Sequence, residues 1–133
     1  MTNQEIATCT LLDDWVAAIN RRDITAVTAL YHPQAQFWGT LAGHLRTSNE
    51  DIGGYYRHFL DCHRMQVEID SADLVPLPGG LLLAAGAYRF CWQNTETAAQ
   101  VHARARFSMV FGRDANRWQI RQHHSSGWIE NGI

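Results

Sequence analysis

The sequence predicts an α+β domain in which helices cover one face of an antiparallel sheet. Apolar residues recur at helical spacing in the first half of the chain, whereas apolar and polar residues alternate one by one in much of the second half. Short turns rich in glycine, proline and asparagine separate the alternating segments. Helices that precede a run of such strands are typical of α+β proteins. With 133 residues and no linker or repeat, the chain is expected to form one domain over residues 1–133.

Two helices are expected before the first strand. The first covers about residues 3–20, because the segment TNQE has the form of a capping box and apolar residues follow it at helical spacing. Asp23 can cap the second helix. Pro33 disfavours helical geometry in the residue before it, so the second helix should end by His32.

A third helix is expected to begin after Ser48. Glu50 and Asp51 would lie in its first turn, where the helix dipole favours negative charge. Apolar and aromatic residues then follow on one helical face: Ile52, Tyr55, Tyr56, Phe59 and Leu60. This spacing predicts an amphipathic helix packed against the sheet.

The remaining ordered segments are predicted to be strands. A short strand is expected at residues 35–41, and a second where the pattern changes to alternation at residues 65–70. Residues 81–93 are expected to form a mostly apolar strand, and in the strand at residues 98–111 apolar and polar side chains alternate from Val101 to Met109. The last strand begins at Trp118. These strands are joined by short turns, which favours an antiparallel sheet.

Charge and hydropathy exclude several classes of partner. The formal net charge of −2 gives no electrostatic reason to expect binding to nucleic acid or to an anionic membrane. The longest apolar run, LLLAAGAY, is too short to span a bilayer, and the first ten residues lack the pattern of a secretory signal. We therefore expect no nucleic-acid partner, no membrane association and a cytoplasmic location.

The cysteines do not form a recognisable disulfide or metal pattern. Cys9, Cys62 and Cys91 are odd in number and lack CxxC spacing, which favours free thiols in a reducing compartment. His58 and His63 lie near Cys62 on a helix, but Cys62 and His63 are neighbours that cannot face one ion. We expect no metal site and no cofactor.

Two longer segments resemble a known superfamily. The first is FWGTLAGHLRT, which precedes the helix that carries YYRHF, and the second is the terminal RARFSMVFGRDANRWQIRQHHSSG. Together they resemble the NTF2-like superfamily, close to bacterial relatives of the calcium/calmodulin-dependent protein kinase II association domain and to the SnoaL-like group. The resemblance covers essentially the whole chain. It implies a cone, in which a strongly curved antiparallel sheet wraps around a long helix and encloses an internal pocket.

The resemblance also implies a site inside the cone. In the kinase association domain the pocket is lined by arginines, and Arg89 matches one of these positions. A second position falls on either Arg106 or Ser108, and the third falls on Ser125, where this sequence departs from arginine. The histidine beside the third position is kept as His124.

Six residues are predicted to bind a ligand: Arg89, Arg106, His124, Ser125, Tyr56 and Trp38. The strands around Arg89 carry no carboxylate except Glu96 in a turn, so an arginine that faces the cone would suit a small anionic ligand such as a carboxylate. The alternative is an outward arginine on a solvent-exposed or dimer face. One strand face carries four polar residues: His102, Arg104, Arg106 and Ser108. This face is either a pocket wall or the exposed side of the sheet.

Two adjacent histidines, His123 and His124, lie near the end of the last strand. Neighbouring side chains on a regular strand point to opposite faces, so alternation from Ile120 would direct His124 inward. The resemblance places Ser125 inward, which requires a bulge between Ile120 and Ser125. We expect His124 to reach the cavity and bond Ser125, Tyr56 or a ligand, with His123 at the rim or an interface. His124 is also the candidate catalytic base, because the pKa of histidine is about 6.5; a purely structural histidine is the alternative.

Three functions are compatible with these residues. The first is binding of a small, anionic molecule in the cone, with the reaction left open. The second is a non-catalytic dimerisation or assembly module of the association-domain type, and the third is a SnoaL-like cyclase or isomerase with a histidine base. The steroid-isomerase mechanism needs a buried carboxylate, but Thr40 follows FWG here and no buried acid is evident. We further expect a homodimer through the sheet face, or a larger ring, because the strands carry more apolar surface than the helices can cover.

Overall fold

The structure is a computed structural model, described here over residues 9–130. Its three helices are α2 (Leu11–Asn20), α3 (Ile24–Ala29) and α4 (Asn49–Phe59). Its strands are β1 (Tyr31–Trp38), β2 (Gln66–Leu77), β3 (Leu81–Gln93), β4 (Gln100–Asp114) and β5 (Arg117–Gly127). The strands form one sheet in the order β1-β5-β4-β3-β2, in which only the β1–β5 pair is parallel.

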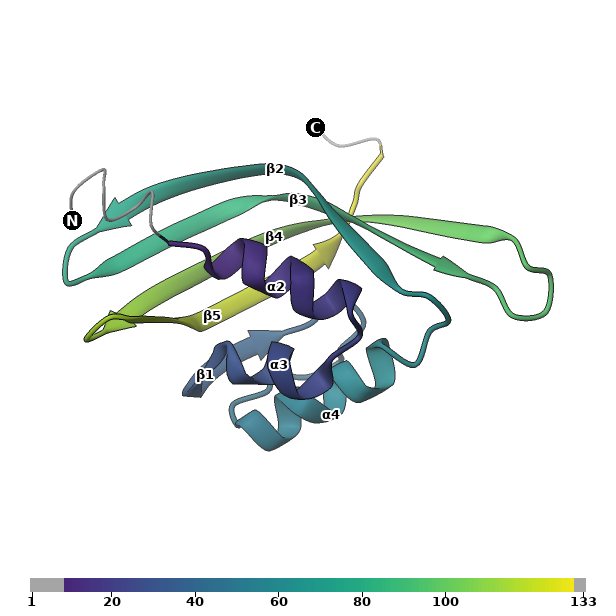
Figure 1. Cartoon of the computed structure of the whole chain (residues 1–133). Coiled ribbons are helices and arrows are strands. Elements are labelled where there is room, and N and C mark those ends of the chain that lie inside the picture. Colours follow the sequence, from purple (N-terminus) through teal and green to yellow (C-terminus); the bar gives the residue numbers. More distant parts are fainter. Residues whose placement is uncertain (1–8, 131–133) are drawn as a thin grey trace.

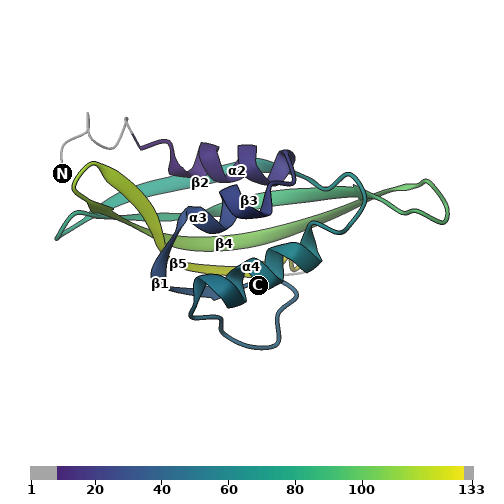
Figure 2. The same cartoon turned by 60° about the horizontal axis from the view of Figure 1, so that its bottom comes forward.

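The helices lie together on one side of the curved sheet, as Figures 1 and 2 show. The core fills the space between the two layers and includes Trp15 and Ile19 of α2 and Ile52 of α4, which are almost completely buried. The inward residues of β4 cover the same core, among them Met109 and Phe111. The predicted α+β fold, with one sheet face covered by helices, is confirmed.

Two predicted helix starts are confirmed by side-chain caps. The Asp23 carboxylate accepts a hydrogen bond from the backbone N–H of Ala26 at 3.0 Å. The Ser48 hydroxyl accepts one from the backbone N–H of Asp51 at 3.1 Å. The described part of the first helix begins at Leu11, and the capping-box segment TNQE lies outside the described residues.

Strand β1 begins earlier than predicted and includes Pro33. The prediction of a strand at residues 35–41 assumed that the preceding helix would extend toward His32, but α3 ends at Ala29. Proline is tolerated because β1 is an edge strand, and its pairing with β5 is interrupted between Tyr31 and Gln36, where no donor is required at Pro33.

Strand β2 continues past the predicted residues 65–70 as far as Leu77, which pairs with Leu81 across a tight turn. Gly79 and Gly80 have φ angles of 83° and 75° in this turn, a region that only glycine adopts without strain. Much of the second half of β2 is exposed on both faces, so apolar and polar residues no longer alternate there. The sequence pattern therefore ended before the strand did.

A β-bulge in the last strand pair sets which residues of β5 face the core. Val110 pairs with Gln122, whereas the next residue of β4, Phe111, pairs with Ile120. Arg121 is therefore an extra residue with no partner in the register, the defining feature of a β-bulge. The sequence correctly predicted a bulge between Ile120 and Ser125.

Two neighbours accommodate the bulged residue. Gly112 leaves room for it, since a Cβ at that position would lie 2.8 Å from Nε of Arg121. Nη2 of Arg121 donates a hydrogen bond to Oδ2 of Asp114 at 2.9 Å. The bulge is thus supported by a glycine and a carboxylate that both belong to β4.

Candidate functional site

The bulge at Arg121 reverses the predicted roles of the two histidines. After the extra residue, alternation directs His123 and Ser125 inward, where they are 1% and 4% exposed. His124 points to the opposite face and is exposed. The prediction that His124 faces the cavity and His123 the rim is therefore wrong, because the extra residue lies before the histidine pair rather than within it. The inward position predicted for Ser125 matches the structure.

A buried chain of hydrogen bonds passes through His123. The indole N–H of Trp15 donates to the hydroxyl of Tyr56 at 3.1 Å, and this hydroxyl bonds that of Tyr31 at 2.5 Å. The hydroxyl of Tyr31 lies 2.7 Å from Nδ1 of His123. Helix α2, helix α4 and strand β1 thus each contribute one side chain to a series of hydrogen bonds that ends at the imidazole.

The series of hydrogen bonds continues on the other side of the imidazole toward the surface. Nε2 of His123 lies 3.1 Å from the hydroxyl of Tyr88, which in turn donates to the hydroxyl of Ser125 at 2.6 Å. The hydroxyls of Ser125 and Thr40 are 2.5 Å apart, and Thr40 is only partly buried. Seven side chains from α2, α4, three strands and the segment after β1 are therefore linked in one row.

Two donors, the indole of Trp15 and the hydroxyl of Tyr88, indicate the direction of the bonds on either side of His123. The indole of Trp15 can only donate, so the hydroxyl proton of Tyr56 is free to go to Tyr31 and that of Tyr31 to Nδ1 of His123. Because Tyr88 donates to Ser125, Nε2 of His123 must carry the proton that Tyr88 accepts. The row is therefore fully satisfied by a neutral His123 in a single tautomer.

Burial suppresses ionisation of these groups. It lowers the pKa of His123 to about 3, with a smaller contribution from the nearby His124. Burial also raises the pKa of Tyr31, Tyr56 and Tyr88 above the usual value for tyrosine. With so low a pKa and both ring nitrogens engaged, His123 is a poor general base near neutral pH.

Aromatic side chains fill the interior of the cone. The ring of Tyr88 stacks on Trp15 and on Phe107, with centroid distances of 5.3 and 4.7 Å. The space left between these rings and the seven-residue row is about 10 Å³. A ligand site usually needs about 300–1,000 Å³, and one water molecule needs about 10–15 Å³. The interior therefore has room for about one water molecule and for no larger ligand.

Arg89 and Arg106 point away from the cone. Arg89 lies between the inward residues Tyr88 and Phe90, so alternation directs it outward, where Nη2 donates to Oδ1 of Asp70 at 2.9 Å. Of the two orientations that the sequence left open for Arg89, the structure has the outward one, and the position predicted inside the cone is wrong. Pairing of β2 with β3 brings Asp70 alongside Arg89. Arg106 is exposed on the same outer face.

Trp38 also lies on the outer face. Its side chain is 39% exposed and is stacked on the imidazole of His124, with a centroid distance of 6.3 Å and an interplanar angle of 19°. Its Nε1–H donates to the carbonyl of Ala42 at 2.9 Å. Of the predicted ligand-binding residues, Tyr56 and Ser125 therefore lie inside the cone. The other four are on the outer face: Trp38, Arg89, Arg106 and His124.

Sequence reasoning missed four members of the buried row: Trp15, Tyr31, Tyr88 and Thr40. Tyr31 directly precedes His32, by which the second helix was expected to end, and Tyr88 lies in the strand expected at residues 81–93, so neither was expected in a site. The charge of Arg121 gave no signal for the bulge, because regular alternation from Ile120 also directs this residue outward.

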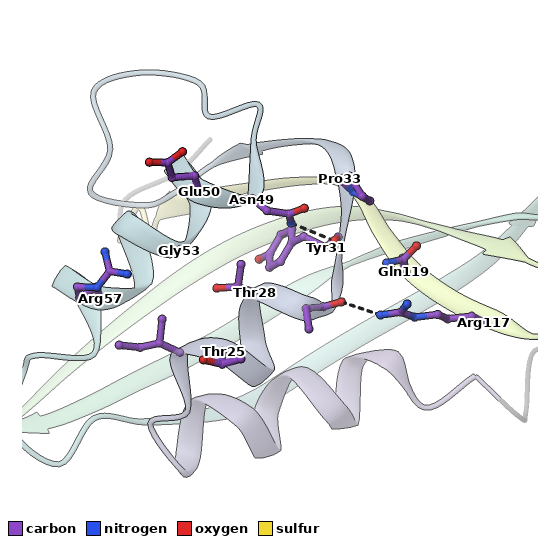
Figure 3. A pocket seen from close by; sticks show the side chains of 12 residues that line it. Thr25, Thr28, Tyr31, Pro33, Asn49, Glu50, Gly53, Arg57, Arg117 and Gln119 are labelled. Atoms are coloured by element: carbon purple, nitrogen blue, oxygen red, sulfur yellow. Dashed lines mark hydrogen bonds between the residues drawn. The ribbon is translucent and has the colours of Figure 1, made fainter.

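A second cavity lies on the helical side, outside the cone. It is an open groove of about 600 Å³ between α3 and α4 and the starts of β1 and β5, and Figure 3 shows Arg57 and Arg117 at its opposite ends. Arg117 donates to the carbonyl of Ala29 at 3.3 Å, and the buried hydroxyl of Thr28 has no hydrogen-bond partner within residues 9–130. The groove contains none of the six residues predicted to bind a ligand.

The described residues contain neither a metal-binding cluster nor a membrane-spanning helix. Over residues 9–130, no three side chains of histidine, cysteine, aspartate or glutamate are grouped so that they could hold a metal ion. In the same part of the chain, no helix has both the length and the hydropathy needed to cross a bilayer.

Comparison with known proteins places this fold in a family. A family model described as a SnoaL-like domain matches residues 9–130. A protein from Xanthomonas campestris, named as a calcium/calmodulin-dependent protein kinase II association domain, is 27% identical with a TM-score of 0.85, and the match covers 98% of this chain and 91% of that one. None of the curated proteins matches the chain.

Two more distant structures share the fold. The association domain of the same kinase from C. elegans is 15% identical with a TM-score of 0.74, covering 92% of this chain and 95% of that one. A ketosteroid isomerase-like protein from Erwinia carotovora atroseptica is 20% identical with a TM-score of 0.80, covering 96% and 99%. The predicted resemblance is confirmed, and the chain belongs to the SnoaL-like family of NTF2-like domains.

Proposed function

We propose that this domain is an assembly module that pairs with a second copy of itself through the outer face of its sheet. The outer face is defined here as the strand positions that point away from the helices. The observation that carries the proposal is a contrast between the two faces. The inner face is covered by helices, and the space left around the seven-residue row is about 10 Å³, whereas no described helix covers the outer face (Figures 1 and 2).

The centre of the outer face suits close contact with another sheet. One row of residues in register crosses all five strands: Asp73, Ala85, Ser108, His124 and Trp38. Small side chains occupy its middle, where a second sheet could approach closely, and the stacked Trp38 and His124 lie at one end. Tryptophan is among the residues most enriched at the energetic centres of interfaces.

The neighbouring row adds apolar surface. Val75, Leu83 and Val110 are in register on the outer face, and Val75 is 43% exposed. The sequence had suggested a dimer for another reason, namely that one face of the strand at residues 81–93 would remain uncovered, either the face with Tyr88 and Phe90 or the opposite one. Both are buried beneath the protein's own helices, so the proposal now depends on the small and mixed surface of the outer face. Such composition is usual for non-obligate interfaces.

The comparisons support an assembly role without establishing it. The Xanthomonas protein and the C. elegans domain are both named as association domains. Binding of a small anionic molecule in the cone has less support, because Arg89 and Arg106 point outward and side chains would have to move before a ligand could enter.

Multi-angle light scattering over a micromolar concentration range tests the proposal. The wild type should have twice the chain mass of 15.1 kDa. Ala85→Glu should produce the monomer, because it places two charges at the centre of a two-fold interface without a partner. Thr25→Glu is the matched control on the exposed helical side and should leave the dimer intact. A wild type that remains monomeric at 100 μM, a concentration on the order of the weakest specific assemblies, would overturn the proposal.

A further inference from the structure

We infer that the outer faces of two copies pack together so that strand β2 of each copy lies over strand β4 of the other. In this arrangement Asp73 meets Arg106 of the partner subunit. This inference rests on the proposed function and names the contact that orients the two copies. It follows from three features of the outer face: the positions of its charges, the ion pairs already formed within the chain, and the constraints of two-fold symmetry.

Acidic and basic residues are segregated on different strands of the outer face. The carboxylates of Glu68, Asp70 and Asp73 belong to β2, at one edge of the sheet. The guanidinium groups of Arg104 and Arg106 belong to β4, and β3 separates the two rows. A surface with acids on one side and bases on the other can complement a rotated copy of itself.

Part of this charge is neutralised within the chain, and part is not. Asp70 contacts Arg89 at 2.9 Å and Arg104 at 3.8 Å, so one carboxylate holds two guanidinium groups. Within residues 9–130, Asp73 and Arg106 form no ion pair, and both are exposed. Glu68 is also exposed and forms no ion pair in this part of the chain, but it is in register with Arg89. Asp73 and Arg106 are in register with Ala85 and Ala87, so they are the opposite charges that have no opposite charge beside them in the sheet.

Two-fold symmetry allows two simple ways to place one outer face on another. If the axis runs across the strands, each strand lies over its own copy, and Arg106 and the other β4 arginines face like charges. If the axis runs along β3, strand β2 of each copy lies over β4 of the other. Electrostatic repulsion disfavours the first arrangement and attraction favours the second.

The small residues of β3 fit the second arrangement. At the level of this contact, Ala85 and Ala87 would lie on the axis, where bulky side chains would hold the sheets apart. Arg89 lies farther along the axis, and its charge is already paired with Asp70. Asp73 is in register with Ala85, and Arg106 is in register with Ala87. These rows are two residues apart, about 7 Å along the strand, which an arginine side chain can span. The contact would occur twice in each dimer.

A charge swap, measured as the dimer dissociation constant by analytical ultracentrifugation, tests the contact. Asp73→Arg and Arg106→Asp should each raise the dissociation constant more than tenfold, since each reversal creates two repulsive contacts. The double variant carrying both substitutions should return to within about threefold of the wild type, because attraction is restored with the signs exchanged. Glu50→Arg, on α4 and away from the outer face, is the control and should have no effect.

The outcomes separate this inference from the proposed function. A monomeric wild type would refute the dimer itself. A dimeric wild type whose dissociation constant is unchanged by either single reversal would refute only the contact between Asp73 and Arg106 of the partner subunit. A double variant whose dissociation constant rises by the product of the two single-variant increases would also refute the contact. Circular dichroism of each variant checks that these exposed substitutions leave the fold intact.

Discussion

Acid should destabilise this domain through His123. The imidazole is buried and neutral in the folded chain, with its pKa lowered to about 3, whereas an unfolded chain would protonate it with a pKa of about 6.5. Between these two values the unfolded state binds more protons, so stability falls as the pH falls from about 6.5 toward 3. Above pH 6.5 the group has almost no effect, and below pH 3 the loss is complete.

The size of the effect follows from the two pKa values. Relative to pH 7.5, protonation of this one site in the unfolded chain lowers the free energy of unfolding by about 2 kcal/mol at pH 5 and by about 3 kcal/mol at pH 4. Small domains have about 5–15 kcal/mol in total, so the loss at pH 4 is a large share of stability. The main cause is burial of the imidazole, with a smaller contribution from His124. A proton on Nδ1 would also displace the proton that the Tyr31 hydroxyl shares with this nitrogen.

Urea unfolding of the wild type, His123→Gln and His124→Gln at pH 7.5, 6, 5 and 4 isolates this term. His123→Gln removes the titrating group but retains an amide donor and acceptor. Between pH 7.5 and 5 its free energy of unfolding should therefore fall by about 2 kcal/mol less than that of the wild type. His124→Gln alters the exposed neighbour and should keep most of the wild-type pH dependence. Parallel profiles for the wild type and His123→Gln would refute the reasoning, because they would show that His123 does not titrate between these states.

Two further predictions concern stability at neutral pH. Gly54→Ala should stabilise the protein by about 0.5–1 kcal/mol, because the position is helical and a Cβ there would meet no atom within 4 Å. Gly86→Ala should instead destabilise it in the same thermal-unfolding assay, since its Cβ would collide with the backbone carbonyl of Ser71; equal shifts for both variants would contradict the packing argument. Tyr88→Phe should cost about 1–3 kcal/mol by leaving buried groups such as the Ser125 hydroxyl without their donor, and an unchanged urea midpoint would show that the row contributes no stability.

The sequence by itself determined the elements and the family. The caps at Asp23 and Ser48 and the strand at residues 81–93 appear in the structure where they were predicted. Each depends on interactions among residues close together in the chain, such as a side chain that bonds a backbone N–H three residues later. Period-two alternation likewise divided the residues of β4 correctly between two faces, because β4 contains no extra residue of its own in either pairing. It left open whether the polar face lined a pocket or the outside of the sheet.

Only the tertiary structure decided which side chains meet. The bulge was expected in β5, but its position at Arg121 depends on Gly112 and Asp114 of the neighbouring strand, and a shift of a few residues exchanges His123 for His124. The partner of Arg89 likewise depends on pairing with β2, since Asp70 lies 19 residues away in the chain. The volume left in the cone depends on how side chains from six segments interlock. Register and packing are long-range properties, and one residue inserted in a strand reverses the direction of every side chain that follows it.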